Sequence, residues 1–181
     1  MIFKACDANT SFALLIDVQE KLFPKIYKCD EIKEKITLLL KGLKALGIPI
    51  LRSEQYPKGL GKTIYPLEEY TNNVFEKTTF SCMQDAKLAS EIQKFTPRSC
   101  IVMGIETHIC VLQTVRDLIE NDFSVIVCQD ATSSRSEIDK QSALSELRLM
   151  GARITTCETI LFEMIKAKEH PQFKTISQCV K

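Results

Sequence analysis

Excess charge of one sign, long apolar runs and histidine are all scarce in this 181-residue chain. Its charges nearly cancel, leaving a formal net charge of +1. Proteins that bind nucleic acid usually carry a basic stripe or have a high pI, so this balance disfavours a nucleic-acid partner. The longest apolar runs, such as 12–16 and 101–103, are far too short to span a bilayer. We therefore expect neither nucleic acid nor a membrane among its partners.

Patterns for metal binding and for disulfides are also missing, although the chain has eight cysteines. There is no Cys-x-x-Cys pair and no Cys/His spacing typical of a zinc site. The length, the ordinary composition and the absence of a secretory signal argue against a disulfide framework. Cys100 and Cys128 lie in apolar, strand-like runs, so we expect them to be buried as small apolar side chains.

Targeting signals and domain boundaries are equally absent. Residues 1–7 show neither the apolar core of a secretory signal nor the basic amphipathic pattern of a transit peptide. A cytoplasmic location is the expectation, with an association with mitochondria left open as the alternative. No repeat, linker or low-complexity segment divides the chain, and its length fits one domain over residues 1–181.

Short apolar runs alternate with helical periods along the whole chain. This alternation predicts βαβ units, and hence a three-layer, doubly wound α/β fold with a six-stranded, mostly parallel sheet. Asp30 and Ser136 are candidate helix N-caps. The irregular stretch 53–73 is long enough to indicate a lid or binding loop. Strands are expected over 12–17, 48–52, 74–77, 99–104, 123–128 and 152–156, and helices over 30–46, 87–95, 108–120, 136–150 and 158–178.

Three complementary polar side chains follow strands of this predicted sheet. Asp17 ends the first strand, Lys77 ends the third, and Cys110 opens the helix after the fourth. Ligands of doubly wound sheets bind at the carboxyl ends of the strands, where these residues should converge. A helix N-terminus lowers the pKa of a thiol, so Cys110 is the candidate nucleophile. Asp17 would take its proton and Lys77 would keep Asp17 ionised. Ordinary capping or loop roles are the alternative for each residue alone.

Three motifs resemble those of the isochorismatase-like cysteine hydrolases. They are Leu14-Leu-Ile-Asp17-Val-Gln-Glu, Phe75-Glu-Lys77-Thr-Thr-Phe-Ser and Gly104-Ile-Glu-Thr-His-Ile-Cys110-Val. The resemblance covers about residues 11–165 and, through the stretch 53–61, favours the eukaryotic isochorismatase-domain-containing subgroup, some of whose members are named after a mitochondrial-associated ribonuclease. It implies a catalytic triad of Asp17, Lys77 and Cys110, and an oligomer, as a dimer or tetramer.

The resemblance also implies a cis peptide bond between Ile105 and Glu106. This bond would turn the Glu106 N–H toward the Cys110 N–H to form an oxyanion hole, with the Glu106 side chain pointing away. Metal-dependent nicotinamidases of the superfamily carry Asp-x-His after the second strand, where this chain has Ser53-Glu54-Gln55. We therefore expect no metal ion and no cofactor.

The function implied is hydrolysis of a small amide, imide or ester by a metal-independent enzyme, through a covalent intermediate on Cys110. Two other functions stay open. The first is a non-catalytic interaction protein on a hydrolase scaffold, because a fold does not fix function. The second is a ribonuclease activity, which the names of relatives suggest.

Four residues are candidates to contact a substrate. Gln19 and Phe23 follow the first strand, Tyr56 lies in the long irregular stretch, and Ile105 adjoins the predicted cis bond. A surface position for Gln19, a core position for Phe23 and a solvent-exposed position for Tyr56 are the alternatives.

Two further side chains lie near the predicted triad in sequence. His108 precedes Cys110 by two positions, and helical neighbours at that spacing diverge, so no Cys–His pair is expected. Cys82 follows Lys77 by five positions. It is either a second reactive thiol or, as the usual burial of cysteine favours, a buried one.

Overall fold

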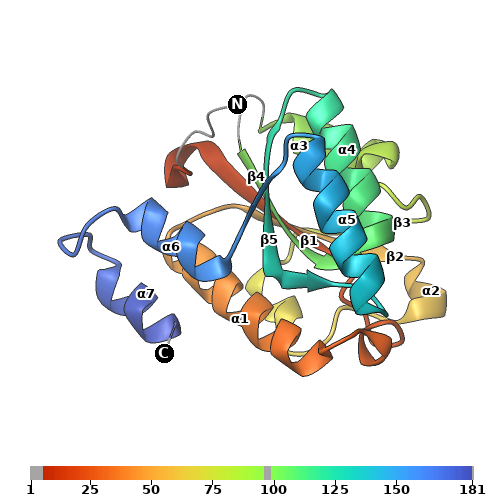
Figure 1. The fold of residues 1–181 in the computed structure, drawn as a ribbon, viewed down its shortest axis with the longest axis horizontal. Helices are drawn as coiled ribbons and strands as arrows, with labels where there is room; N and C mark the ends of the chain where they lie inside the picture. Colours follow the sequence, from red (N-terminus) through yellow and green to blue (C-terminus); the bar gives the residue numbers. More distant parts are fainter. Residues whose placement is uncertain (1–5, 96–98, 181) are drawn as a thin grey trace.

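A six-stranded, entirely parallel sheet runs through the centre of the molecule (Figure 1). The computed structural model describes residues 6–95 and 99–180. The strand order is β3-β2-β1-β4-β5-β6, so the predicted doubly wound α/β sheet is confirmed. The strands are β1 (Ser11–Ile16), β2 (Ile50–Gln55), β3 (Val74–Lys77), β4 (Ser99–Ile105), β5 (Ser124–Ser133) and β6 (Arg153–Thr155).

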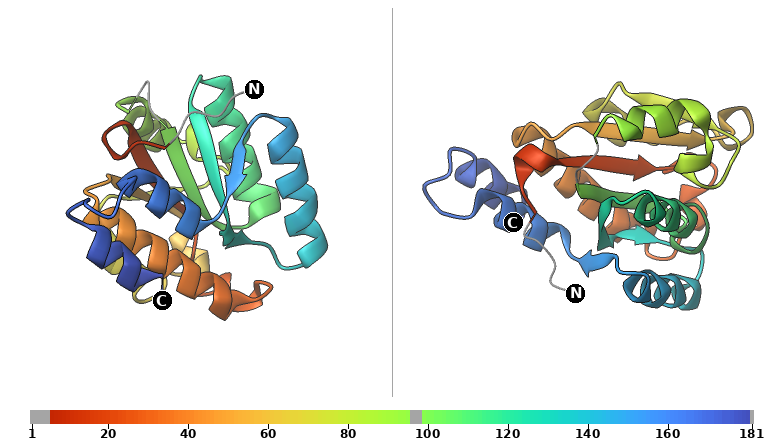
Figure 2. Two further views of the ribbon diagram at one scale, coloured as in Figure 1. Left: turned by 60° about the vertical axis from the view of Figure 1, so that its left-hand side comes forward. Right: turned by 90° about the horizontal axis from the view of Figure 1, so that it is seen from above.

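Helices cover both faces of the sheet and complete the three layers (Figures 1 and 2). One face packs against α1 (Cys29–Ala45), α6 (Cys157–Ile165) and α7 (Phe173–Cys179), and the other against α3 (Ala86–Gln93), α4 (Leu112–Glu120) and α5 (Glu137–Leu149). A hydrophobic cluster fills each interface, as a parallel sheet buried on both sides requires. Cys100 and Cys128 are fully buried in opposite clusters, which confirms their predicted packing role.

Two predicted helix starts have different outcomes. The Ser136 hydroxyl accepts a hydrogen bond from the Asp139 N–H at 3.2 Å, so the predicted cap of α5 is confirmed. For α1 the N-cap is Lys28, in a left-handed conformation, and Asp30 lies inside the first turn. The prediction of Asp30 as the cap was therefore wrong, although its carboxylate still faces the positive end of the helix dipole.

The second strand runs past its predicted end. It continues through polar residues to Gln55 because these residues pair with β3, in a register that places Arg52 beside Val74 and Gln55 beside Lys77. The predicted irregular stretch therefore begins only after Gln55. It contains the short helices α2 (Pro57–Leu60) and η3 (Leu67–Tyr70). Short 3₁₀ turns also occur at η1 (Ala8–Thr10), η2 (Phe23–Lys25) and η4 (Cys82–Gln84).

Within residues 6–95 and 99–180, no helix is both long and apolar enough to cross a membrane. Most of the amino-terminal segment used above to judge targeting lies outside the described residues.

Candidate active site

The candidate site lies at the carboxyl edge of the sheet, where the strand order changes direction between β1 and β4. Asp17 follows β1 directly, in a left-handed conformation with φ of 52°. Lys77 is the last residue of β3. Cys110 lies in the turn after β4. Ligands of open α/β sheets bind at such a switch point, so the predicted convergence places these residues where chemistry is expected.

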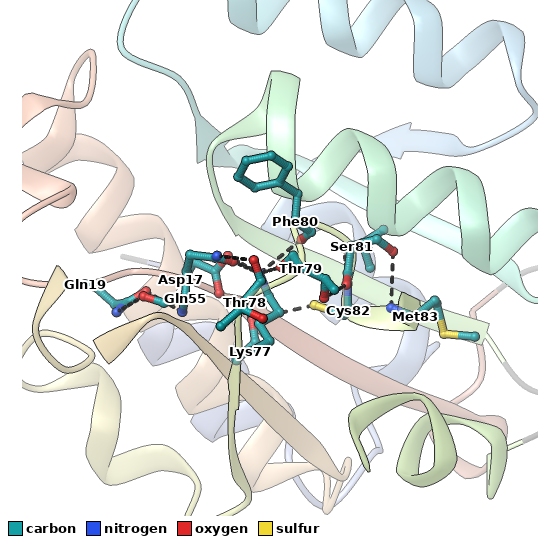
Figure 3. A network of polar contacts seen from close by, with 12 residues as sticks. Asp17, Gln19, Gln55, Lys77, Thr78, Thr79, Phe80, Ser81, Cys82 and Met83 are labelled. Atoms are coloured by element: carbon teal, nitrogen blue, oxygen red, sulfur yellow. Dashed lines mark hydrogen bonds and ion pairs between the residues drawn. The ribbon is translucent and has the colours of Figure 1, made fainter. Parts of the chain in front are cut away.

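Asp17 and Lys77 form a buried ion pair (Figure 3). Lys77 Nζ lies 2.7 Å from Asp17 Oδ2, and both side chains are 0% exposed. The ammonium also donates to Gln55 Oε1 at 2.7 Å and to the carbonyl oxygens of Thr79 and Phe80 at 3.1 and 3.0 Å. Burial by itself would lower the pKa of Lys77 and is the largest single influence on it, but the charge and hydrogen bond of Asp17 together with the nearby thiols of Cys82 and Cys110 outweigh burial, so the pKa is raised. Lys77 is thus a cation held in place, and its ammonium protons are all used in these hydrogen bonds.

The second oxygen of Asp17 has its own donor. Ser53 Oγ donates to Asp17 Oδ1 at 2.7 Å, and Cys82 Sγ donates to Ser53 Oγ at 3.6 Å. Burial raises the pKa of the Cys82 thiol to about 11. Cys82 is 0% exposed, so the predicted alternative of a buried thiol is confirmed.

Cys110 is held in a π-helical turn, η5 (Thr107–Val111), that precedes α4. The prediction that Cys110 opens an ordinary α-helix is wrong in this respect. The Val111 N–H bonds the carbonyl of Glu106 at 3.2 Å, five residues back, which widens the first turn. Cys110 is 7% exposed and belongs to the apolar cluster that packs against α4.

The Cys110 thiol is not activated in the way that the sequence suggested. Burial raises its pKa well above the ordinary value, and the nearby charge of Asp17 and a hydrogen bond to that carboxylate add to the effect. Lys77 opposes these effects without cancelling them. The predicted lowering by a helix terminus is therefore wrong, because desolvation dominates. The resting site holds a neutral thiol near a carboxylate.

The segment between β4 and η5 has an unusual backbone. The Ile105–Glu106 peptide bond is cis, and Gly104 before it has φ of 120°. A Cβ on Gly104 would lie 2.2 Å from the carbonyl oxygen of Ile16, so the close approach of β4 to β1 requires glycine here. The Glu106 carboxylate accepts from the Arg135 main-chain N–H at 3.2 Å and from its Nε at 3.0 Å, so it has a partner of its own.

The candidate substrate contacts fall into different environments. Gln19 is fully buried, and its amide bonds the main chain of Gln55 and of Gly61. Phe23 and Ile105 are buried in the cluster under α1. All three side chains pack within the fold, and their contact with a substrate stays a prediction.

Tyr56 differs from the other three candidates. It is 55% exposed and lines a cavity of about 330 Å³ together with Lys77, Thr78 and Asp85. Tyr56 is therefore the one of these four candidates whose side chain remains available to a ligand.

The ring of His108 is hydrogen-bonded away from Cys110 in sequence, because its Nδ1 lies 2.9 Å from Ser134 Oγ.

Sequence reasoning missed Ser53 and Gln55, which it considered only as the place of absent metal ligands. Both lie at the carboxyl end of β2, next to β1. The rule that ligands bind at the carboxyl ends of strands would have identified them if the second strand had been predicted to continue to Gln55. Among the described residues, no group of three or more His, Cys, Asp or Glu side chains is placed to hold a metal ion.

Solved structures with the same fold include relatives at two levels of identity. A structure named MAR1 ribonuclease from Caenorhabditis elegans is 35% identical, with a TM-score of 0.91 over 98% of this chain and 92% of that one. The YcaC gene product of Escherichia coli, described as an octameric hydrolase of unknown specificity, has a TM-score of 0.88 at 18% identity. Its match covers 99% of this chain and 98% of that one, and it shows the fold alone.

Sequence comparison shows the family. Residues 11–159 match the isochorismatase domain. The isochorismatase domain-containing protein 1 of Danio rerio is 41% identical over 173 residues, which are 95% of this chain. This chain spans only 61% of the length of that relative. The chain therefore belongs to the isochorismatase family.

Proposed function

We propose that this protein is a cysteine hydrolase that cleaves a small amide, imide or ester without a metal ion. The observation that carries the proposal is the buried Asp17–Lys77 ion pair, which lies near enough to the Cys110 thiol for both charges to act on its pKa. An acid, a fixed cation and a thiol with limited solvent contact have the residue types and order that acyl transfer needs. The absence of histidine from Ser53-Glu54-Gln55 supports catalysis without a metal ion.

In the proposed first step, Cys110 Sγ attacks the substrate carbonyl carbon while its proton passes to Asp17. The oxyanion that forms would accept hydrogen bonds from the main-chain N–H groups of Glu106 and Cys110. Asp17 then returns the proton to the leaving amine or alcohol, and a thioester remains on Cys110. Water, deprotonated by Asp17, attacks that thioester and releases the acid and the thiol.

Lys77 acts throughout as a fixed charge. Its four acceptors leave no proton for transfer, so its role is to hold Asp17 and to offset the negative charge that appears on sulfur. The raised pKa of Cys110 means that the thiolate forms together with attack, and not in the resting protein.

The test is a panel of small amides and activated esters incubated with the protein and read by intact mass. We expect an acyl adduct that peptide mapping places on Cys110, and none in Cys110→Ala. Cys128→Ala is the matched control, because that thiol is also buried but belongs to the cluster on the other face of the sheet. Turnover that survives in Cys110→Ala would refute the proposed nucleophile.

A ribonuclease is the second candidate, favoured by the name of the 35% identical structure from Caenorhabditis elegans. Degradation of a labelled RNA by the native protein and by Cys110→Ala decides between the two. Loss of RNA cleavage together with loss of ester cleavage would assign both to one site, and RNA cleavage unaffected by the substitution would separate them. The octameric YcaC structure supports a homo-oligomer, which light scattering would measure.

A further inference from the structure

The buried Asp17 carboxylate is contacted by a residue that the proposed triad does not include. Ser53 Oγ donates to Asp17 Oδ1 at 2.7 Å, while Lys77 occupies Oδ2 at the same distance. Ser53 is 0% exposed and is carried by β2, the strand between those that carry Asp17 and Lys77. The carboxylate is therefore held at both oxygens by groups from two neighbouring strands.

The direction of the Ser53 hydrogen bond is fixed by its other neighbour. A hydroxyl has one proton to donate, and an ionised carboxylate only accepts. The thiol of Cys82 donates to Ser53 Oγ at 3.6 Å, so the hydroxyl proton is left for Asp17. Cys82 is protonated because burial raises its pKa to about 11. The order of donation is thus Cys82 to Ser53 to Asp17.

We propose that Ser53 is a positioning residue that fixes the Asp17 carboxylate toward Cys110 and weakens it as a base. This inference deepens the proposed function and rests on it for its catalytic meaning. With Oδ1 bonded to Ser53 and Oδ2 to Lys77, the carboxylate cannot rotate without breaking a charge-assisted hydrogen bond. A neutral donor also stabilises the ionised form, so Asp17 binds a proton less tightly than it would without Ser53.

The titratable groups that act on one another here come from four elements: Asp17 after β1, Lys77 of β3, Cys82 of η4 and Cys110 of η5. The pKa of each of Lys77, Cys82 and Cys110 is raised, so none of these three groups changes its protonation on the acid side of neutrality. The acid limb, which is the fall in Cys110 reactivity as the pH is lowered, therefore reports protonation of the carboxylate that takes the thiol proton.

The experiment measures the rate of Cys110 alkylation by iodoacetamide from acidic to neutral pH, with peptide mass spectrometry to isolate that thiol. In Ser53→Ala we expect the midpoint of the acid limb to move to higher pH by about one to two units, as loss of a hydrogen bond to a charged group implies. Ser133→Ala is the matched control. Its hydroxyl is also buried at the end of a strand, but it bonds the Tyr27 carbonyl at 3.0 Å.

A purely structural role for Ser53 would change the plateau rate and leave the midpoint in place. That outcome, or an equal shift in Ser133→Ala, would overturn the inference. If Ser53→Ala does not fold, Ser53→Cys keeps nearly the same volume with a poorer donor, and it must shift the midpoint in the same direction. The alkylation rate can be measured without any substrate being cleaved. If the midpoint shifts in Ser53→Ala but the native protein cleaves no ester, only the proposed function is refuted. If the native protein cleaves esters but the midpoint does not shift, only the role of Ser53 is refuted.

Discussion

Removing the charge of Lys77 should be the most costly single change at the site. Lys77→Met deletes the ammonium and keeps most of the aliphatic stem. It leaves Asp17 ionised, 0% exposed and without its 2.7 Å partner. It also removes the donor to Gln55 Oε1 and to two main-chain carbonyls. Breaking a buried pair from one side costs about 3–5 kcal/mol, and we expect a loss of unfolding free energy in that range.

Urea unfolding followed by far-ultraviolet circular dichroism measures this loss, since the chain has no tryptophan for fluorescence. Lys94→Met is the matched control, because Lys94 pairs with Glu91 at 2.5 Å but its side chain is 64% exposed. An exposed pair contributes about 0.2–1 kcal/mol, so the control should change little.

A double-substitution cycle isolates the interaction between the two charges. Asp17→Asn with Lys77→Met removes both charges, so the double variant should be less destabilised than the sum of the single variants. Acidification should restore part of the stability of Lys77→Met, because protonation of Asp17 removes the unpaired buried charge. A loss below about 1 kcal/mol in Lys77→Met, or strict additivity in the cycle, would refute this account of the site.

Two other predictions concern the frame of the site. Gly104→Ala should destabilise the protein by roughly 4 kcal/mol or more in the same unfolding assay, because its Cβ would lie 2.2 Å from the carbonyl oxygen of Ile16. Gly47→Ala, with φ of 71° but nothing within 4 Å, should cost only about 1–2 kcal/mol, and equal losses would contradict the steric explanation. Burial raises the pKa of Cys82 from 9.0 to about 11 in the folded state, so its contribution is complete below pH 9.0 and is lost as pH rises to about 11. The stability difference between the native protein and Cys82→Ala should therefore shrink by about 2–3 kcal/mol over that window, and a constant difference would argue against this burial effect.

The alternation of apolar runs and helical periods was enough to predict the layers, the parallel sheet and the place of Asp17, Lys77 and Cys110. This follows because strand and helix periods are local, and because a right-handed crossover leaves little choice of topology. A strand that ends in a polar residue therefore marks the edge of the sheet where ligands bind. The cap at Ser136 was equally local, since the hydroxyl and the Asp139 N–H that it accepts from are three positions apart.

What only the tertiary structure decided depends on contacts between distant parts of the chain. Ser53 lies 36 positions from Asp17, and Lys77 lies 60 positions from it. The polar end of β2 is a strand because β3 pairs with it, and the strand propensity of these residues does not predict that pairing. The protonation of Cys110 was decided in the same way. A helix terminus lowers the pKa of a thiol, but burial beside a carboxylate raises it more strongly, and burial exists only once the chain has folded.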